Sequence, residues 1–111
     1  MEPLDPVLHQ PSRTHIAAFL VGCGEATFGE LKRALGISDG NLESHLKKLI
    51  AAGYVVVRKE TGGGRPQSFY ALTAPGQAAL KAYVAAFQRL LNLAPEPGPA
   101  PVPMAWREKP G

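Results

Sequence analysis

The chain has 111 residues, of which 45% are hydrophobic and 19% charged, so we expect one globular domain with one core. Its formal charge of +3 permits an acidic partner such as nucleic acid but does not establish one. The single cysteine, Cys23, excludes an intrachain disulfide and a cysteine-rich metal site.

The N-terminal residues are acidic and contain prolines, unlike the basic start of a signal peptide. No apolar run approaches the roughly 18 residues of a membrane span. We therefore expect a cytoplasmic protein that has no membrane partner.

The first predicted helix follows Ser12, which is a suitable cap. Ile16 and Leu20 lie at helical spacing within it. The helix should end near Val21, because two glycines follow closely.

Two further helices, separated by only a few residues, come next. A capping-box pattern that starts at Thr27 predicts a helix closed by Gly36. Ser38 or Asp39 then caps a third helix, 39–52. Two helices joined by so short a connection are typical of a helix-turn-helix.

A β-hairpin is predicted directly after the third helix. Residues 54–59 and 67–72 are rich in β-branched and aromatic side chains and predict two strands. Residues 61–66 contain three consecutive glycines and a proline, which predicts a turn between them.

A last helix begins after Thr73 and carries one broad apolar face. From residue 94 onward, prolines alternate with small residues, which predicts an extended or disordered tail. We therefore expect a mainly α chain with a small β-hairpin, an α+β winged helix-turn-helix. The DNA-binding domain with its flanking dimerisation helices would span 1–93, and the proline-rich tail 94–111.

Several segments resemble the MarR/ArsR-like transcription regulators. Residues 31–49 resemble their helix-turn-helix, and residues 52–55 look like the exit from their recognition helix. Residues 64–66 and 69–73 look like their wing and its second strand. The resemblance covers roughly residues 5–92 and implies a short, single-domain regulator that binds double-stranded DNA.

The chain also departs from these regulators. It lacks the paired cysteines of the metal-sensing ArsR proteins and the long extra helices that build the MarR ligand cleft. The resemblance therefore implies the fold and DNA binding, and it leaves a small-molecule effector unidentified.

The third helix has the pattern of a recognition helix. With Leu42, Leu46 and Leu49 on the core side, its opposite side is small and polar first and basic later. In a major groove, the first part of such a helix meets base edges and flanking lysines meet phosphates. The predicted contacts on this helix are Ser38, Gly40, Asn41, Ser44, Lys47 and Lys48.

The hairpin adds two predicted DNA contacts. Lys59 flanks the turn, and Arg65 lies beside glycines that permit close approach to a backbone. Arg65 suits a narrow minor groove, where negative potential is concentrated. The alternative for the helix is a cap at Ser38 and a solvated polar face. Asp39 and Glu43 oppose phosphate, so they should lie off the contact line or limit nonspecific binding.

A homodimer is also predicted, because the last helix and the N-terminal segment carry more apolar surface than a small domain covers. Two recognition helices would then read half-sites about 34 Å apart. The alternative is that this face packs only on its own domain. The predicted interface comprises Leu4, Val7, Leu8, Tyr83, Phe87, Leu90 and Leu91.

The sequence thus predicts a sequence-specific transcription regulator, in the simplest case a repressor. It would read the major groove with helix 39–52 and contact the backbone or minor groove with wing 60–66. Two alternatives stay open. One is a protein-interaction module whose tail docks through Trp106, and the other is a redox or ligand sensor that uses Cys23 or the dimer interface.

No catalytic constellation, metal cluster or cofactor motif stands out, so neither an enzyme nor a cofactor is expected. The three histidines do not cluster in sequence. His15 is expected to pack in or beside the core, and His45 to be partly buried.

Overall fold

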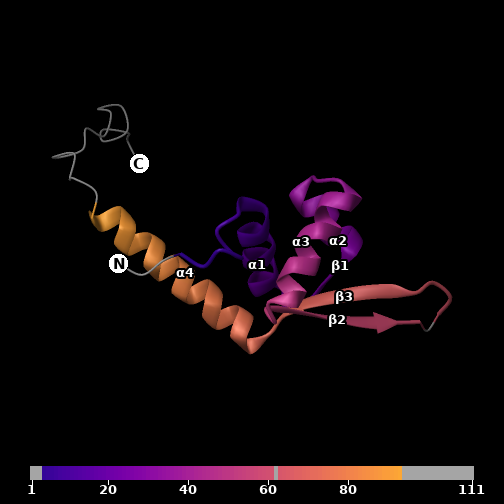
Figure 1. Ribbon diagram of the computed structural model, residues 1–111. Helices are drawn as coiled ribbons and strands as arrows, with labels where there is room; N and C mark the ends of the chain where they lie inside the picture. Colours follow the sequence, from indigo (N-terminus) through magenta and orange to yellow (C-terminus); the bar gives the residue numbers. More distant parts are fainter. Residues whose placement is uncertain (1–3, 62, 94–111) are drawn as a thin grey trace, which may run out of the picture.

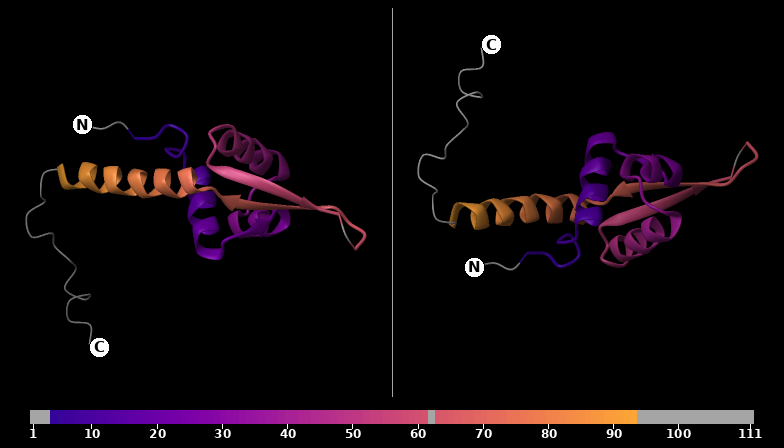
Figure 2. Two further views of the ribbon diagram at one scale, coloured as in Figure 1. Left: turned by 90° about the horizontal axis from the view of Figure 1, so that it is seen from below. Right: turned by 90° about the horizontal axis from the view of Figure 1, so that it is seen from above.

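The computed structural model describes residues 4–61 and 63–93. Helices α1, α2 and α3 gather into one group, and the β2–β3 hairpin and α4 leave this group in opposite directions (Figures 1 and 2). In chain order the elements are α1 (Pro11–Cys23), β1 (Ala26–Thr27), α2 (Phe28–Leu35), α3 (Asp39–Ala51), β2 (Val55–Glu60), β3 (Gln67–Leu72) and α4 (Ala74–Leu93).

The predicted tail at 94–111, including Trp106, lies outside the described residues, as does Gly62 of the wing. Within the described ranges, the predicted order of helix, helix-turn-helix, hairpin and helix is confirmed. The predicted α+β fold class is correct.

Local capping fixes both helices of the helix-turn-helix. The Glu30 amide donates to Thr27 Oγ1 at 3.1 Å, and the Thr27 amide donates to Glu30 Oε1 at 2.8 Å. Gly36 ends α2 in the left-handed conformation, with φ of 67°. Ser38 caps α3, because its Oγ accepts from the Asn41 amide at 3.2 Å. This decides between the two expected caps in favour of Ser38.

The first helix starts slightly earlier than predicted. Gln10, not Ser12, is its cap, and Gln10 Oε1 accepts from the Arg13 amide at 3.1 Å. Pro11 occupies the first turn, where a missing amide hydrogen does no harm. The helix ends at Cys23, and Gly24 follows with φ of 84°.

The hairpin belongs to a three-stranded antiparallel sheet with the order β1-β3-β2. Strand β1 was not predicted. It has only two residues, which pair with Phe69 and Tyr70 of β3. A two-residue strand carries no periodic pattern, and its partner lies far away in the sequence.

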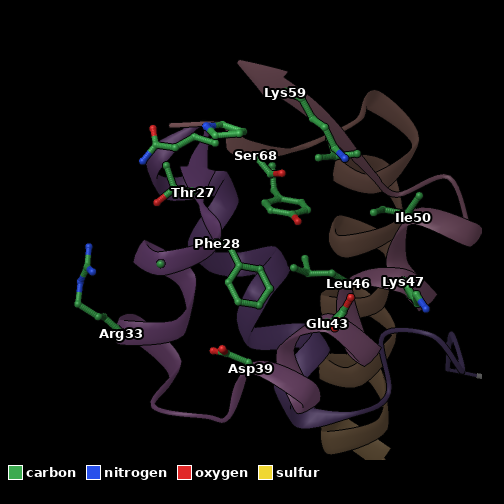
Figure 3. Close-up of a pocket in the computed structure, with 15 residues that line it drawn as sticks. Thr27, Phe28, Arg33, Asp39, Glu43, Leu46, Lys47, Ile50, Lys59 and Ser68 are labelled. Carbon is green, nitrogen blue, oxygen red and sulfur yellow. The ribbon is translucent and has the colours of Figure 1, made fainter. Parts of the chain in front are cut away.

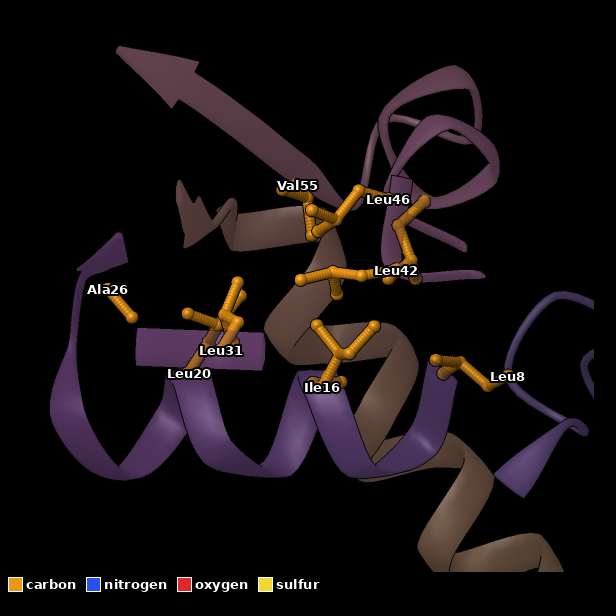
Figure 4. Close-up of a cluster of buried hydrophobic side chains, with 10 residues drawn as sticks. Leu8, Ile16, Leu20, Ala26, Leu31, Leu42, Leu46 and Val55 are labelled. Atoms are coloured by element: carbon orange, nitrogen blue, oxygen red, sulfur yellow. The ribbon is translucent and has the colours of Figure 1, made fainter. Parts of the chain in front are cut away.

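The core lies where α1, α2 and α3 meet the base of the sheet (Figure 4). The three leucines of α3 are all buried, as predicted. Helix α4 contributes only partly buried side chains, from Ala79, Leu80 and Tyr83. The buried hydrophobic residues are Leu8, Ile16, Ala17, Leu20, Ala26, Leu31, Leu42, Leu46, Leu49 and Val55.

Two sequence predictions need correction. Leu8 was expected at a dimer interface, but its side chain is 1% exposed and belongs to the core of its own chain. The reason is a turn, in which Asp5 Oδ1 accepts from the Val7 amide at 2.8 Å and directs Leu8 inward. His15 was expected in or beside the core, but it lies on the exposed side of α1.

The start of α4 is fixed to the corner between α3 and β2. The Thr73 amide donates to the Tyr54 carbonyl at 3.0 Å, and the Thr73 hydroxyl donates to the Gly53 carbonyl at 2.6 Å. Gly76 lies so close that a Cβ there would be 2.2 Å from the Tyr54 carbonyl oxygen. Only glycine fits this approach, which ties α4 to the end of α3.

Candidate nucleic-acid interface

The predicted recognition face of α3 is exposed along its whole length. It lies opposite the buried leucines of the same helix, as its 3.6-residue periodicity requires. The exposed residues that the sequence assigned to this face are Ser38, Gly40, Asn41, Ser44, Lys47 and Lys48.

The N-terminal end of this face is suited to an anion. Ser38 Oγ accepts the capping hydrogen bond from the Asn41 amide, and its own proton remains able to donate outward. The end of the helix also carries the positive pole of the helix dipole. A cap and a phosphate contact are therefore compatible roles for Ser38.

An ion pair links α2 to α3. Lys32 Nζ lies 2.8 Å from Asp39 Oδ1. Both side chains are largely exposed, so the pair adds little stability. It does balance the charge of Asp39, which otherwise would face an anionic partner at the start of the recognition helix. The sequence did not reveal this pairing.

A groove runs between α3 and the hairpin (Figure 3). Arg33 of α2, Lys47 of α3 and Lys59 of β2 all line it, although they come from three different elements. Phe28 and Tyr70 lie in it as well, with ring centroids 6.5 Å apart. The structure thus brings together two predicted contacts, Lys47 and Lys59, which the sequence had assigned separately to helix and wing.

The same groove contains carboxylates. Asp39 and Glu43 line its α3 side. They lie on the flank of the helix that turns toward α2 and the wing, beside the outward face that carries Ser44 and Lys48. The two acids thus share the groove with Lys47 and Lys59, and their place off the contact line stays a prediction.

Arg65 is exposed near the tip of the hairpin, beyond the last paired residues. Gly63 and Gly64 precede it with φ of 75° and 107°, a conformation that other residues rarely adopt. The tip lies far from the helices in both views of Figure 2. It can therefore approach a nucleic-acid backbone without a clash from the body of the domain.

His45 lies on another flank of α3, toward α1, and is partly buried as predicted. Arg13 Nη1 lies 3.3 Å from His45 Nδ1. Burial lowers the pKa of His45 below 6.5, and the positive charges of Arg13 and Lys48 lower it further. His45 is thus a structural contact between α1 and α3.

A second surface lies on the part of α4 that extends past the core. Val84, Phe87, Leu90 and Leu91 are exposed there, and Leu91 is 59% exposed. The ring of Phe87 stacks on that of Tyr83 at 6.2 Å. Val21 of α1 is also exposed. Neither Val21 nor Val84 was among the predicted interface residues.

Other candidate chemistry is limited in the part of the chain that the structure describes. Cys23 is exposed, and its thiol lies 3.5 Å from the Glu25 carbonyl oxygen. No group of three or more histidine, cysteine, aspartate or glutamate side chains within residues 4–61 and 63–93 is placed to hold a metal ion.

None of the described helices combines the length and the apolar character needed to cross a bilayer.

Comparison with known proteins decides the family. A family model described as a winged helix DNA-binding domain matches residues 12–91. The chain belongs to the winged helix DNA-binding domain family. A relative from Methanocaldococcus jannaschii, an uncharacterized protein, is 40% identical over 72 residues, which cover 65% of this chain and 78% of the relative.

Solved structures of this winged helix class agree. A transcriptional regulator homologue from Pyrococcus horikoshii OT3 superposes with a TM-score of 0.73 at 27% identity, covering 78% of this chain and 85% of that one. The transcriptional repressor BigR from Xylella fastidiosa superposes with a TM-score of 0.57 at 28% identity, covering 81% and 82%.

The structural neighbours are MarR/ArsR-type regulators, which confirms the resemblance seen in the sequence. The chain is a DNA-binding transcription regulator, and its family and fold are those of DNA-binding regulators rather than of enzymes.

Proposed function

We propose that this winged helix protein is a cytoplasmic, homodimeric repressor that occludes a promoter by reading two half-sites of double-stranded DNA. The observation that carries the proposal is the α3 face. It is exposed, uncharged at its start and basic near its end, and it lies opposite three buried leucines. A polar helix face of this kind fits a major groove.

In the proposed complex, the first turn of α3 meets base edges. The Asn41 amide can donate to and accept from an adenine edge at the same time. Ser44 and the backbone at Gly40 add contacts that need little space. Lys47 and Lys48, further along the helix, reach phosphates on the groove walls.

The wing forms the second part of the proposed interface. Arg65 enters or borders the adjacent minor groove, where a narrow groove strengthens the negative potential. Lys59 faces the groove between wing and α3 and neutralises a phosphate there. Helix and wing together hold the duplex at two places, which sets its orientation on the domain.

Dimerisation through α4 completes the proposal. The first half of α4 packs on its own core through Ala79, Leu80 and Tyr83. The second half continues the same apolar stripe, where Phe87 is 40% exposed and Leu91 is 59% exposed. The same stripe on α4 of a second copy of the chain would bury both Phe87 and Leu91.

The domain limits remain part of this proposal. We infer one DNA-binding unit with dimerisation helices in residues 1–93 and a separate tail segment at 94–111. One structural neighbour, BigR, is a transcriptional repressor, which supports repression as the direction of control.

The test is selection of duplexes by the purified chain from random and genomic DNA, followed by binding titrations at several salt concentrations. The expected result is an enriched sequence with two related half-sites, and an affinity that falls linearly with the logarithm of salt concentration. Sedimentation should give a dimer at micromolar concentration. Absence of any enriched sequence, or a monomer with and without DNA, would contradict the proposal.

A further inference from the structure

Arg58 is a wing residue with positive charge that the DNA interface described above does not use. We propose that Arg58 is a positioning residue, which fixes the direction of the wing through Glu25 and makes no contact with DNA itself. The inference rests on the proposed DNA binding by α3 and the wing tip.

All three nitrogens of the Arg58 guanidinium donate to carboxylates of its own molecule. Its Nε donates to Glu25 Oε2 at 3.1 Å, and its Nη2 donates to Glu25 Oε1 at 2.9 Å, which is the two-pronged geometry that arginine and a carboxylate favour. Its Nη1 donates to Glu60 Oε2 at 2.5 Å. The cation also lies 4.6 Å from the centre of the Phe69 ring.

These contacts cross the whole sheet. Arg58 of β2 is paired in register with Phe69 of β3, and Phe69 is paired on its other side with Thr27 of β1. Glu25 lies just before β1, on the connection that leads from α1 to α2. The side chain of Arg58 therefore reaches over the central strand and connects one edge of the sheet to the other.

The wing needs such a connection because β1 has only two residues. Beyond this short pairing, the hairpin projects from the body of the domain as a two-stranded ribbon (Figure 2). Arg65 lies four residues beyond Phe69, roughly 13 Å along the strand. A rotation of about 10° at the base would move Arg65 by about 2 Å, enough to take it out of hydrogen-bonding range of a groove.

Arg58 also lies on the wrong face of the hairpin for a DNA contact. Successive residues of a strand point to opposite faces. Val57 and Lys59 line the groove that faces α3, so Arg58 lies on the other face. Two carboxylates surround its single positive charge, which leaves this face with one net negative charge and makes it unfavourable to a phosphate.

The local charges support the same assignment. The hydrogen bond from Arg58 lowers the pKa of Glu25 below 4.5, so the carboxylate is ionised wherever the protein would bind DNA. Glu25, followed by Glu60, raises the pKa of Arg58 further above its ordinary value. Both groups therefore stay charged at neutral pH. Because their side chains are 47% and 42% exposed, the pair adds little stability, and its proposed effect is on the direction of the wing.

The experiment uses the full chain and the duplex that the wild-type chain selects. Arg58→Met removes the cation but keeps an unbranched stem, and Arg58→Lys keeps the charge but removes the two-pronged geometry. Glu25→Gln removes the negative charge of the partner carboxylate and leaves Arg58 unchanged. Melting temperature reports whether each variant folds.

We expect all three variants to weaken binding to the extent that Arg65→Ala does, up to about tenfold. Hydroxyl-radical protection at the minor groove should be lost, whereas protection of guanine N7 in the major groove by α3 should persist. The double variant Arg58→Met/Arg65→Ala should bind no worse than Arg65→Ala, because Arg58 acts through the wing tip.

A direct phosphate contact predicts a different set of results. Arg58→Lys would then keep its affinity, because it keeps the positive charge that a phosphate contact needs. The effects of Arg58→Met and Arg65→Ala would also add. Any of these results would overturn the inference, and so would unchanged wing protection in Glu25→Gln. Failure of the wild-type chain to select DNA would instead contradict the proposed function.

Discussion

Helices α3 and α4 are both amphipathic, but the protein covers their apolar faces to very different degrees. In α3 the three leucines are at most 2% exposed. In α4, Leu80 is partly buried and Leu91 is 59% exposed, although both belong to the same stripe. Spacing along a helix thus identifies an apolar face, and only the neighbouring elements determine how much of it the same chain buries.

The two helices are also connected. Thr73 and Gly76 hold the start of α4 against Gly53 and Tyr54 at the end of α3. We therefore expect a change in the direction of α4, for example through its proposed dimer contact, to shift the end of the recognition helix. The following predictions test the contrast between the helices and the junction between them.

The largest effect on stability is expected in the core-facing side of α3. Leu49→Ala should lower the free energy of unfolding by about 2–5 kcal/mol, because it leaves a cavity at a fully buried site. Leu91→Ala, on the exposed end of α4, should change it by less than about 0.5 kcal/mol in dilute, monomeric protein. Urea denaturation of both variants measures the difference, and equal losses would show that α4 is covered as fully as α3.

The exposed end of α4 should govern association. Phe87→Glu places a charge in the proposed interface and should shift the protein to monomers, with a loss of operator affinity above about tenfold. Asn92→Glu adds the same charge to an exposed polar position of the same helix and is the matched control. Sedimentation velocity and titration of DNA measure both effects, and a stable Phe87→Glu dimer would refute this interface.

The junction between the helices should not tolerate a side chain. Gly76→Ala would place a Cβ 2.2 Å from the Tyr54 carbonyl oxygen and should cost about 1–3 kcal/mol of stability. Gly22→Ala is the control, because a Cβ there has no neighbour within 4 Å and alanine favours a helix. In thermal unfolding, Gly76→Ala should therefore lower the melting temperature, whereas Gly22→Ala should raise it. A neutral Gly76→Ala would mean that α4 is not held tightly at this corner.

The outward side of α3 should affect binding rather than stability. Lys48→Ala should weaken binding to all duplexes alike. It should also reduce the slope of log affinity against log salt concentration by about 0.9. Asn41→Ala should instead cost about 1–3 kcal/mol at one base position and relax the preference there. Repeating the selection of DNA with each variant distinguishes the two roles. An unchanged sequence preference in Asn41→Ala would show that Asn41 does not contact a base.

The smallest effect is expected from His45, on the flank of α3 that faces α1. Its pKa is lowered in the folded protein, so the unfolded chain binds a proton more readily. The free energy of unfolding should therefore fall as the pH drops through 6.5 toward the folded pKa, and stay level above 6.5. His45→Gln should remove this fall in the free energy of unfolding between pH 6.5 and the folded pKa. The same substitution at the exposed His15 should leave the fall in place. An unaltered slope in His45→Gln would assign the pH dependence to other groups.

The helices of this protein were predictable because their signals are local. The capping box at Thr27, the cap at Ser38 and the spacing of the α3 leucines all act within one or two helical turns. The exposed face of α3 follows directly from that spacing. Position along one helix was sufficient to select its candidate DNA contacts, which stay a prediction.

The sheet was less predictable because its contacts join distant residues. Strand β1 depends on Phe69 and Tyr70 for its pairing, and no pattern within two residues announces it. The link from Arg58 to Glu25 likewise appears only when the strands are placed side by side. In the sequence, Arg58 is one cation among several near the turn.

The sequence by itself determined the order of the four helices and the hairpin, the bounds of α2, and the amphipathic character of α3 and α4. Only the tertiary structure placed Leu8 in the core, brought Lys47 and Lys59 to one groove, and left the end of α4 exposed. The reason is physical. Helix caps and periodicity depend on backbone groups a few residues apart, whereas burial and convergence depend on which distant surfaces pack together.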